Sequence, residues 1–222
     1  GVLKGVRLAD GSEERFDAVV LAAAWWSVAL AAPLGLKLPV RPVKGYSLTL
    51  PLPGGGADAD DADDAANAAD ADSANGANDA TDDARGPQPR TPLVDHDLHI
   101  AVVPVVGSRL RVAGTAEFCG EDRRLDPARI GNLMRSLLQL YPALAGHAKR
   151  APRQEWTGLR PMCADGKPLI GATRVPGLYL NTGHGQLGWT TAAASGELLA
   201  AAVTRRAPPI DAAPFLASRF GL

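Results

Sequence analysis

The pattern of apolar and polar positions predicts a hairpin and a buried strand at the start of the chain. Asp10-Gly11, a strong turn signal, follows the extended segment Gly5 to Leu8. The continuous apolar run within Phe16 to Ala24 is typical of a strand that is covered on both faces. Ser27 is then expected to cap a short helix over Val28 to Ala32.

Alternation of apolar and polar residues predicts a sheet in the middle of the chain. The segment from Arg41 to Leu52 is extended, with Tyr46, Leu48 and Leu50 on one face. Three further strands are predicted, with a turn at Gly107-Ser108 between the last two: Leu93-Val94, Ile100 to Val103 and Leu110 to Ala113.

Helical periodicity is found twice in the second half. Asp126-Pro127, a capping acceptor before a proline, begins an amphipathic helix that ends at Pro142. Strands are predicted at Gln154 to Leu159 and Gly177 to Asn181, and a glycine-rich turn then leads into a helix from about Leu187 to Arg205. Because strands and helices mix without a regular repeat, the fold class is α/β or α+β with a mixed sheet.

Composition separates one segment from the rest of the chain. Residues 54 to 84 contain ten Asp and twelve Ala and neither Lys nor Arg. Such a segment cannot bury enough apolar surface to offset the entropy of ordering it, so residues 54–86 are interpreted as a disordered insertion. Without its ten Asp, the chain has 23 basic and 14 acidic residues, a formal charge of +9 instead of −1. A basic folded part suits an anionic ligand, a membrane surface or nucleic acid, and charge alone does not choose among them.

Several other features exclude classes of protein. Cys119 and Cys163 lie far apart without a CxxC spacing, so neither a disulfide framework nor a zinc site is expected. No apolar run approaches the roughly 20 residues of a membrane span. No metal site is predicted either, because His96 and His99 would point to opposite faces of a strand and the acidic segment lacks the regular glycine turns of calcium-binding repeats.

Two features could carry chemistry. Gly183, Gly185 and Gly188 let the backbone approach a flat ligand just before a helix N-terminus, whose unpaired N–H groups favour negative charge. Arg160, at the end of a predicted strand, could hold a carboxylate by two parallel hydrogen bonds or could form a structural salt bridge. Many strand–helix junctions carry similar glycine turns, so these residues alone leave the function open.

Long motifs follow one another along the chain: Val40-Arg-Pro-Val-Lys-Gly-Tyr-Ser-Leu48, Arg111-Val-Ala-Gly-Thr-Ala-Glu117, Gly158-Leu-Arg-Pro161 with Asp165-Gly166 and Ile170-Gly171, and Asn181-Thr-Gly-His-Gly-Gln-Leu-Gly-Trp-Thr190 with Ser195-Gly196. In this order they resemble the C-terminal half of the D-amino acid dehydrogenases, within the D-amino acid oxidase and glycine oxidase superfamily. The resemblance covers the whole chain outside the acidic segment.

The resemblance implies an FAD-dependent oxidoreductase that deaminates D-amino acids to 2-oxo acids and ammonia. Arg160 would be the catalytic arginine that pairs with the substrate carboxylate, and Tyr46 would also bind substrate. Tyr46 could equally be an ordinary sheet residue, and His184 could bond to backbone instead of flavin. The residues expected to line FAD are Ala23, Ala24, Gly183, His184, Gly185, Gln186, Leu187, Gly188, Trp189 and Thr190.

The chain also departs from this family. Flavoproteins of this kind begin with a strand and a GxGxxG loop, which do not occur here, and they usually have glycine where Ala24 stands. We therefore expect this polypeptide alone to bind FAD weakly or not at all. The expected domains are a remnant of an FAD-binding domain at 1–40, a substrate domain at 41–53 and 87–157, and a return to the FAD-binding domain at 158–222.

Two alternatives stay open at this point. One is a glycine, sarcosine or proline-type FAD oxidase, and the other is a non-catalytic module that binds an anion or another protein. The expected partners are a D-amino acid and an electron acceptor such as a quinone or the respiratory chain, without nucleic acid. The expected location is the cytoplasm, either free or peripheral on the inner face of the bacterial cell membrane.

Overall fold

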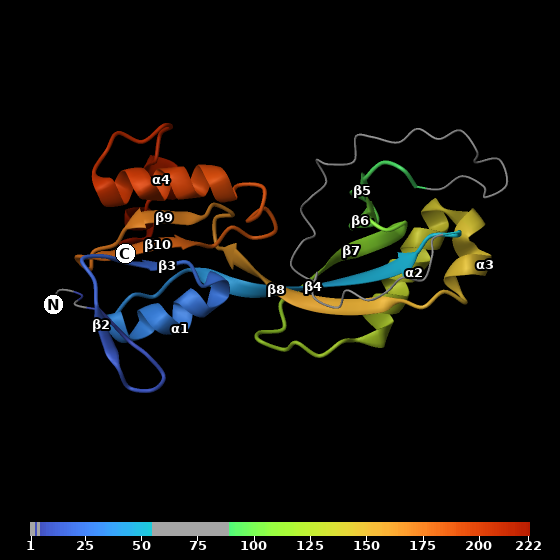
Figure 1. Cartoon of the computed structure of the whole chain (residues 1–222), viewed down its shortest axis with the longest axis horizontal. Helices are drawn as coiled ribbons and strands as arrows, with labels where there is room; N and C mark the ends of the chain where they lie inside the picture. The colour runs from blue at the N-terminus through green and yellow to red at the C-terminus, as the bar shows by residue number, and fades with distance from the viewer. Residues whose placement is uncertain (1–2, 4, 55–88) are drawn as a thin grey trace. The chain divides into compact units, whose positions relative to one another are not determined.

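The computed structural model describes residues 3, 5–54 and 89–222, so the predicted insertion at 54–86 falls almost entirely outside the described residues. The chain divides into two compact units (Figure 1). Unit 1 comprises residues 1–43, 119–121 and 159–222, and unit 2 comprises residues 44–118 and 122–158. The assignment of cofactor-binding and substrate-binding roles to separate domains stays a prediction.

Unit 1 is built on a three-stranded sheet with the strand order β3-β10-β9. β3 (Val19–Leu21) runs parallel to β10 (Leu178–Thr182), and β9 (Leu169–Ala172) runs antiparallel to β10. α4 (Ala192–Thr204) packs against β9 and β10 (Figure 1), and α1 (Ser27–Ala31) follows β3. Buried side chains from these elements and their connections form one core, which includes Leu36, Leu38, Val40, Leu169, Leu178, Leu180 and Ala217.

The start of the chain follows the predicted order with shorter elements. The predicted hairpin is confirmed, because β1 (Gly5–Arg7) pairs antiparallel with β2 (Glu13–Arg15). The strand expected within 16–24 is only β3, and its expected covering on both faces is wrong, because Val20 is 38% exposed on one of them. The predicted cap is wrong: Ser27 is the first residue of α1, and Trp26 is the N-cap residue.

Unit 2 contains most of a five-stranded sheet with the order β5-β6-β7-β4-β8. β5 (Leu93–Asp95), β6 (Ile100–Val105) and β7 (Arg109–Glu117) form an antiparallel meander. β4 (Val40–Pro51), which comes earlier in the chain, pairs antiparallel with β7. β8 (Gln154–Cys163) completes the sheet. The predicted middle strands are therefore confirmed, each with slightly different ends.

The core of unit 2 lies between one face of this sheet and α2 (Pro127–Leu140). The Asp126 carboxylate accepts a 2.8 Å hydrogen bond from the amide of Ala128, so the predicted helix start is confirmed. α3 (Ala145–Ala148) follows α2 and contributes to the same core. The buried residues of this core include Tyr46, Leu48, Leu50, Ile100, Val102, Leu110, Val112, Ile130, Leu133 and Leu137.

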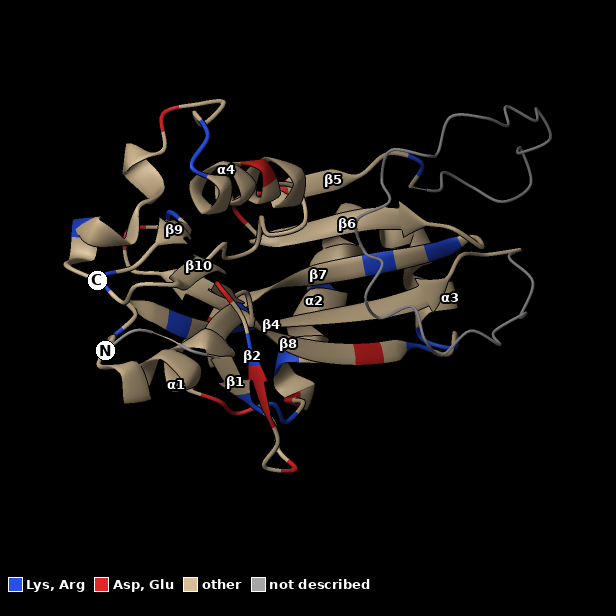
Figure 2. Cartoon of the chain, turned by 60° about the vertical axis from the view of Figure 1, so that its left-hand side comes forward, with Lys and Arg blue, Asp and Glu red and all other residues tan. Residues whose placement is uncertain are grey.

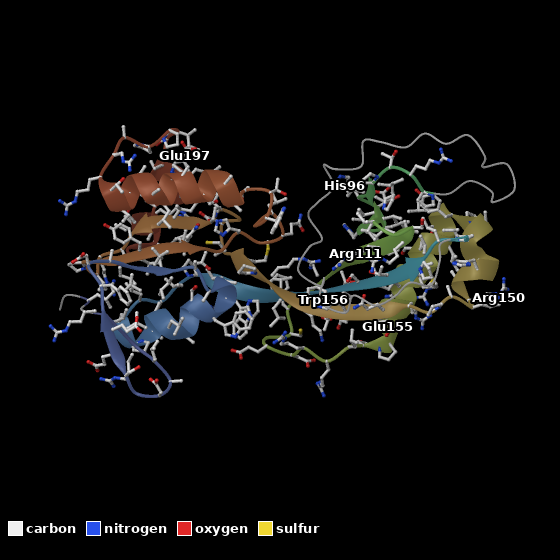
Figure 3. All side chains as sticks on the ribbon, in the orientation of Figure 1. His96, Arg111, Arg150, Glu155, Trp156 and Glu197 are labelled. Carbon is white, nitrogen blue, oxygen red and sulfur yellow. The ribbon has the colours of Figure 1, made fainter. Side chains whose placement is uncertain are left out.

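The other face of the unit 2 sheet is more polar. Thr49 of β4 pairs with Arg111 of β7, and both are partly exposed. The Arg111 guanidinium lies over the ring of Trp156, so these two side chains meet on this face (Figure 3). Elsewhere, basic and acidic side chains are spread over both units (Figure 2).

Two elements in the second half differ from prediction. β8 continues to Cys163, so Arg160 lies within a strand and not at its end. The turn at Asp165-Gly166, where Gly166 has a φ of 74°, reverses the chain into β9, which the apolar pattern did not indicate.

Candidate functional site

Two parallel strands bring predicted cofactor residues to one edge of the unit 1 sheet, the edge at which the carboxyl ends of β3 and β10 lie. β3 and β10 run in the same direction, so the segments after them begin at the same edge. Ala23 and Ala24 follow β3, and Gly183 directly follows β10. The two segments are joined, because Thr182 Oγ1 donates a 2.7 Å hydrogen bond to the carbonyl of Ala24. Ligands of open α/β sheets bind beyond the carboxyl ends of strands, so this edge is the candidate site.

Ala24 has a left-handed backbone, with a φ of 50°. A side chain with a Cβ atom is strained in this region, whereas glycine enters it freely. The family that the sequence resembles usually has glycine here, and the backbone conformation gives a physical reason for that preference.

The end of β8 lies beside the glycine-rich loop at the same edge. Met162 forms an isolated β-bridge with His184, and the amide of Gly185 donates a 2.8 Å hydrogen bond to the carbonyl of Pro161. Arg160 directly precedes this contact in the chain. Its side chain is partly buried, and burial lowers the pKa of its guanidinium. The structure thus brings the backbone around Arg160 and the predicted flavin loop together within unit 1.

The glycines of this loop have local roles that the sequence did not reveal. Gly183 and Gly185 have φ values of 82° and 60°, in the left-handed region. A Cβ atom on Gly185 would also lie only 2.7 Å from the sulfur of Met162. Close approach of a flat ligand is therefore not the first reason for these two glycines. Gly188 is different, because a Cβ atom there would make only an ordinary 3.4 Å contact with His184.

The loop presents backbone N–H groups that the described part of the chain leaves without acceptors. These are the amides of Gln186, Gly188, Trp189 and Thr190. The helix predicted from Leu187 begins only at Ala192, because residues 185–191 form turns. The free amides therefore precede α4, where their dipoles and the positive end of the helix act together. Such a stretch stabilises negative charge placed against it.

The imidazole of His184 bonds to another side chain and not to backbone. Its Nε2 lies 3.1 Å from Ser195 Oγ, and Ser195 is buried in α4. Burial lowers the pKa of His184, which favours the neutral imidazole at pH 7. This hydrogen bond connects the loop to the first turn of α4. The side chains of Leu187 and Trp189, in the same loop, are 55% and 59% exposed.

Three buried polar atoms at or near the sheet edge have no hydrogen-bond partner among the described residues. They are Trp25 Nε1, Ser27 Oγ and Asn181 Oδ1. Buried polar groups without partners are rare in folded proteins and often mark a place where a ligand or another segment binds. A donor, a hydroxyl and an acceptor fit a polar cofactor such as FAD, as do the four free amides of the loop.

Tyr46, predicted to bind substrate, lies in the core of unit 2. It is 1% exposed, and its hydroxyl donates a 2.9 Å hydrogen bond to Glu117, which also pairs with Arg129. Burial raises the pKa of the phenol. The neighbouring Lys44, 2% exposed, donates to the carbonyl of Arg124. These contacts support the interpretation of Tyr46 as a sheet residue, and a role in substrate binding stays a prediction.

One group near the end of β8 was not predicted at all. The Arg219 guanidinium binds both carboxylate oxygens of Asp165, at 2.8 and 3.1 Å, and also the carbonyls of Lys167 and Pro168. This pairing holds the pKa of Asp165 well below its usual range. The motif contains Asp165-Gly166, but the sequence gives no signal that its partner is near the C-terminus.

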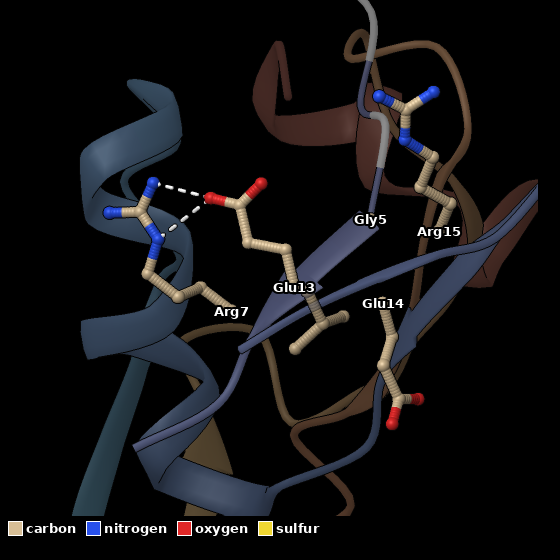
Figure 4. Close-up of a pocket in the computed structure, with 6 residues that line it drawn as sticks. Gly5, Arg7, Glu13, Glu14 and Arg15 are labelled. Carbon is tan, nitrogen blue, oxygen red and sulfur yellow. Dashed lines mark hydrogen bonds and ion pairs between the residues drawn. The ribbon is translucent and has the colours of Figure 1, made fainter. Parts of the chain in front are cut away.

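Other parts of the described chain show no comparable site. A pocket on the β1–β2 hairpin is lined by charged residues, of which Arg7 and Glu13 pair with each other (Figure 4). Among residues 3, 5–54 and 89–222, no three His, Cys, Asp or Glu side chains gather as metal ligands. His96 and His99 lie in the turn between β5 and β6, so their predicted place on a strand is wrong. No described helix has the length and apolar character needed to cross a membrane.

Comparison with known proteins places this geometry in a family. The family model described as FAD dependent oxidoreductase matches residues 1–202. A D-amino acid dehydrogenase of Xanthobacter autotrophicus is 40% identical over 99% of this chain and 44% of its own length. An uncharacterised oxidoreductase of Halorhodospira halophila is 40% identical over 92% of this chain and 79% of its own length.

Solved structures give the same result. Glycine oxidase from Geobacillus kaustophilus superimposes with a TM-score of 0.73 and 26% identity, over 94% of this chain and 47% of that chain. L-proline dehydrogenase from P. horikoshii shares the fold, with a TM-score of 0.72 at 17% identity, over 98% of this chain and 50% of that chain. The chain therefore spans about half the length of these proteins. The expected mixed α/β fold class is confirmed, and the chain belongs to the family of FAD-dependent oxidoreductases.

Proposed function

We propose that this chain forms part of an FAD-dependent D-amino acid dehydrogenase, which converts D-amino acids to 2-oxo acids and ammonia. The relatives at 40% identity that carry this name support the substrate class. The observation on which the proposal rests is the meeting of three segments at one sheet edge: Ala23-Ala24, the end of β8 after Arg160, and the loop 183–190.

FAD, when bound, supplies the acceptor for the hydride that leaves the substrate Cα. The loop residues Gly183 to Thr190 would hold its ring system, and Ala23 and Ala24 would lie along the adjacent segment. The free amides of Gln186, Gly188, Trp189 and Thr190 would stabilise negative charge as it develops in the transition state. His184, kept neutral by burial and held by Ser195, would position this loop.

Arg160 would bind the α-carboxylate of the substrate through two parallel hydrogen bonds. A guanidinium remains charged even where burial lowers its pKa, and partial burial strengthens its attraction for a carboxylate. The substrate amine, arriving neutral, loses the Cα hydride and becomes an iminium, which loses a proton and is hydrolysed to the 2-oxo acid and ammonia. Tyr46 is not required by this proposal.

The experiment combines this chain with the FAD-binding portion of the Xanthobacter autotrophicus relative, co-expressed as a separate polypeptide. We expect reduction of an artificial dye by D-alanine, and a roughly 100-fold fall in kcat/KM for Arg160→Gln, since a charged bidentate contact contributes about 3 kcal/mol. Arg153→Gln, which removes the Arg153–Glu155 ion pair at the start of β8, is the matched control and should change little. Turnover that Arg160→Gln leaves unchanged contradicts the role of Arg160.

A glycine oxidase-like activity is the second candidate, because glycine oxidase is among the structures that superimpose on this chain. An oxidase passes its electrons to oxygen, whereas a dehydrogenase uses another acceptor. Oxygen consumption by the reconstituted protein, with glycine and D-alanine compared, separates the two.

A quinone or the respiratory chain is proposed as the electron acceptor, and the cytoplasm or the inner face of the membrane as the location. The chain by itself is proposed to bind FAD weakly; a stoichiometric yellow flavin in the purified polypeptide would contradict this.

A further inference from the structure

The face of the unit 2 sheet that points away from α2 carries an unusual arginine. Leu110 and Val112 of β7 are fully buried in the core, so Arg111 between them points to the opposite face. On that face Arg111 lies between Thr49 of β4 and Val103 of β6, with which it pairs in register.

Arg111 is partly buried, and the described residues give its side chain no hydrogen-bond acceptor. It makes no side-chain hydrogen bond and no ion pair with any described residue, and the burial of its guanidinium lowers its pKa. By contrast, Arg129 in the same unit and Arg219 in unit 1 each bind a carboxylate. A guanidinium carries five N–H donors, and burying them unpaired costs free energy, so the arrangement favours an external anion.

Trp156 holds the Arg111 side chain in place. The guanidinium carbon of Arg111 lies 5.7 Å from the centre of the Trp156 ring, within the range of a cation–π interaction. The contact with a ring face satisfies no N–H group by a hydrogen bond to oxygen, so donors stay available for a ligand. Figure 3 shows both residues on their strands.

Gly158 explains why the ring can lie there. A Cβ atom on Gly158 would be 2.1 Å from an atom of the Trp156 ring, so the ring lies directly against the backbone of β8. Trp156 remains 43% exposed, and it therefore offers an apolar surface beside the charged group. Gly158 belongs to the motif Gly158-Leu-Arg-Pro161, and in unit 2 its role is to seat this ring.

We propose that Arg111 and Trp156 form a binding site for an organic carboxylate with an apolar body. The carboxylate would accept two hydrogen bonds from Arg111, the Thr49 hydroxyl would donate a third, and the apolar body would lie against the exposed part of the Trp156 ring. The site is made entirely of unit 2 residues, and it depends neither on FAD nor on the proposed function.

The test uses the 222-residue chain, labelled with ¹⁵N, and the pair pentanoate and pentanamide. The two probes have almost the same shape and differ in charge. We expect pentanoate to shift the Trp156 indole signal saturably, with at least tenfold higher affinity than pentanamide. The indole signal is assigned by its loss in Trp156→Phe.

Two arginine variants complete the experiment. Arg111→Gln should weaken pentanoate binding at least tenfold, whereas Arg109→Gln on the same face of β7 should leave it within twofold. Equal shifts by pentanamide, no saturable shift by pentanoate, or unchanged affinity in Arg111→Gln would each overturn the proposal. The comparison of the two probes on the unchanged chain stands even where a variant fails to fold. Since no flavin or turnover is measured, these outcomes are independent of the dye assay of Arg160.

Discussion

At the scale of single residues, the candidate site includes a backbone conformation that the residue type would not predict, that of Ala24. Ala24 is strained at a φ of 50°, and its carbonyl is fixed by Thr182 from the neighbouring strand. The same hydrogen bond that joins the two segments therefore also helps to hold Ala24 in an unfavourable conformation.

We predict that Ala24→Gly stabilises the chain by about 1 kcal/mol, because glycine has no Cβ penalty in the left-handed region. The free energy of unfolding from urea titrations measures the effect. Ala23→Gly is the matched control: Ala23 has a φ of −88°, so glycine there should destabilise by about 0.5–1 kcal/mol through the entropy of the unfolded chain. A loss of stability in Ala24→Gly would show that the strain is compensated elsewhere.

Single residues also show what the sequence could and could not indicate. The motifs identified Gly158, Gly185 and Arg160 as special positions. They did not indicate why, because Trp156 against Gly158 and Met162 against Gly185 are contacts made by the fold. Partners far apart in the sequence leave no local pattern, and Arg219 with Asp165 is the clearest example.

At the scale of elements, the Asp165–Arg219 pair joins the turn after β8 to the C-terminal segment. Because the folded pKa of Asp165 is depressed, its contribution to stability is fully present above its unfolded pKa, near 4, and is lost progressively as the pH falls from there through the lower folded pKa. The direction is therefore destabilisation on acidification.

We predict that Asp165→Asn lowers the free energy of unfolding by about 1 kcal/mol at pH 7, with a smaller difference at pH 3. Urea titrations at both pH values measure this. Asp17→Asn, at an exposed position before β3, should follow the unchanged protein at both. A deficit for Asp165→Asn that is as large at pH 3 as at pH 7 would contradict the linkage.

Helix α2 offers a second prediction at this scale. Gly131 lies in the interior of α2, and a Cβ atom there would meet nothing within 4 Å apart from its chain neighbours and the backbone of its own helix. Gly131→Ala should therefore raise the free energy of unfolding by about 1 kcal/mol through helix propensity. Gly114→Ala should do the reverse, since its Cβ atom would lie 2.7 Å from the carbonyl oxygen of His99. Thermal unfolding followed by circular dichroism compares the stabilities of the two variants. A destabilised Gly131→Ala would contradict the inference that a Cβ atom fits at position 131 without a clash.

Elements with a strong local signal were predictable and others were not. α2 has a capping aspartate, a first-turn proline and a clear apolar stripe, and its start matches prediction. α4 was expected too early, because Leu187 fits the helical pattern while the turns at 185–191 delay the helix. β9 was missed because Leu169–Ala172 is too short to show a period.

At the scale of the whole molecule, two cores divide the chain. Unit 1 is centred on leucines of β9 and β10, and unit 2 on leucines of β4, β7 and α2. Composition and motifs indicated a mixed fold and the family, but the division into units depends on contacts between distant segments.

We predict that the two cores respond separately to mutation. Leu180→Ala, at a fully buried position of unit 1, should cost about 3 kcal/mol and speed hydrogen exchange mainly in β9 and β10. Leu133→Ala, its counterpart in unit 2, should act mainly on β6 and β7. Equal acceleration in both units by either variant would show that they unfold as one.

The position of β3 at the border of its sheet has a practical consequence. One side of β3 has no strand beside it among the described residues, so its backbone donors and acceptors there are open to pairing, and Val20 on this strand is 38% exposed. An exposed edge strand pairs readily with the edge strand of another copy, so we expect the purified polypeptide to aggregate at high concentration. Val20→Lys should reduce this aggregation, because a charge on the strand opposes edge-to-edge pairing of two copies.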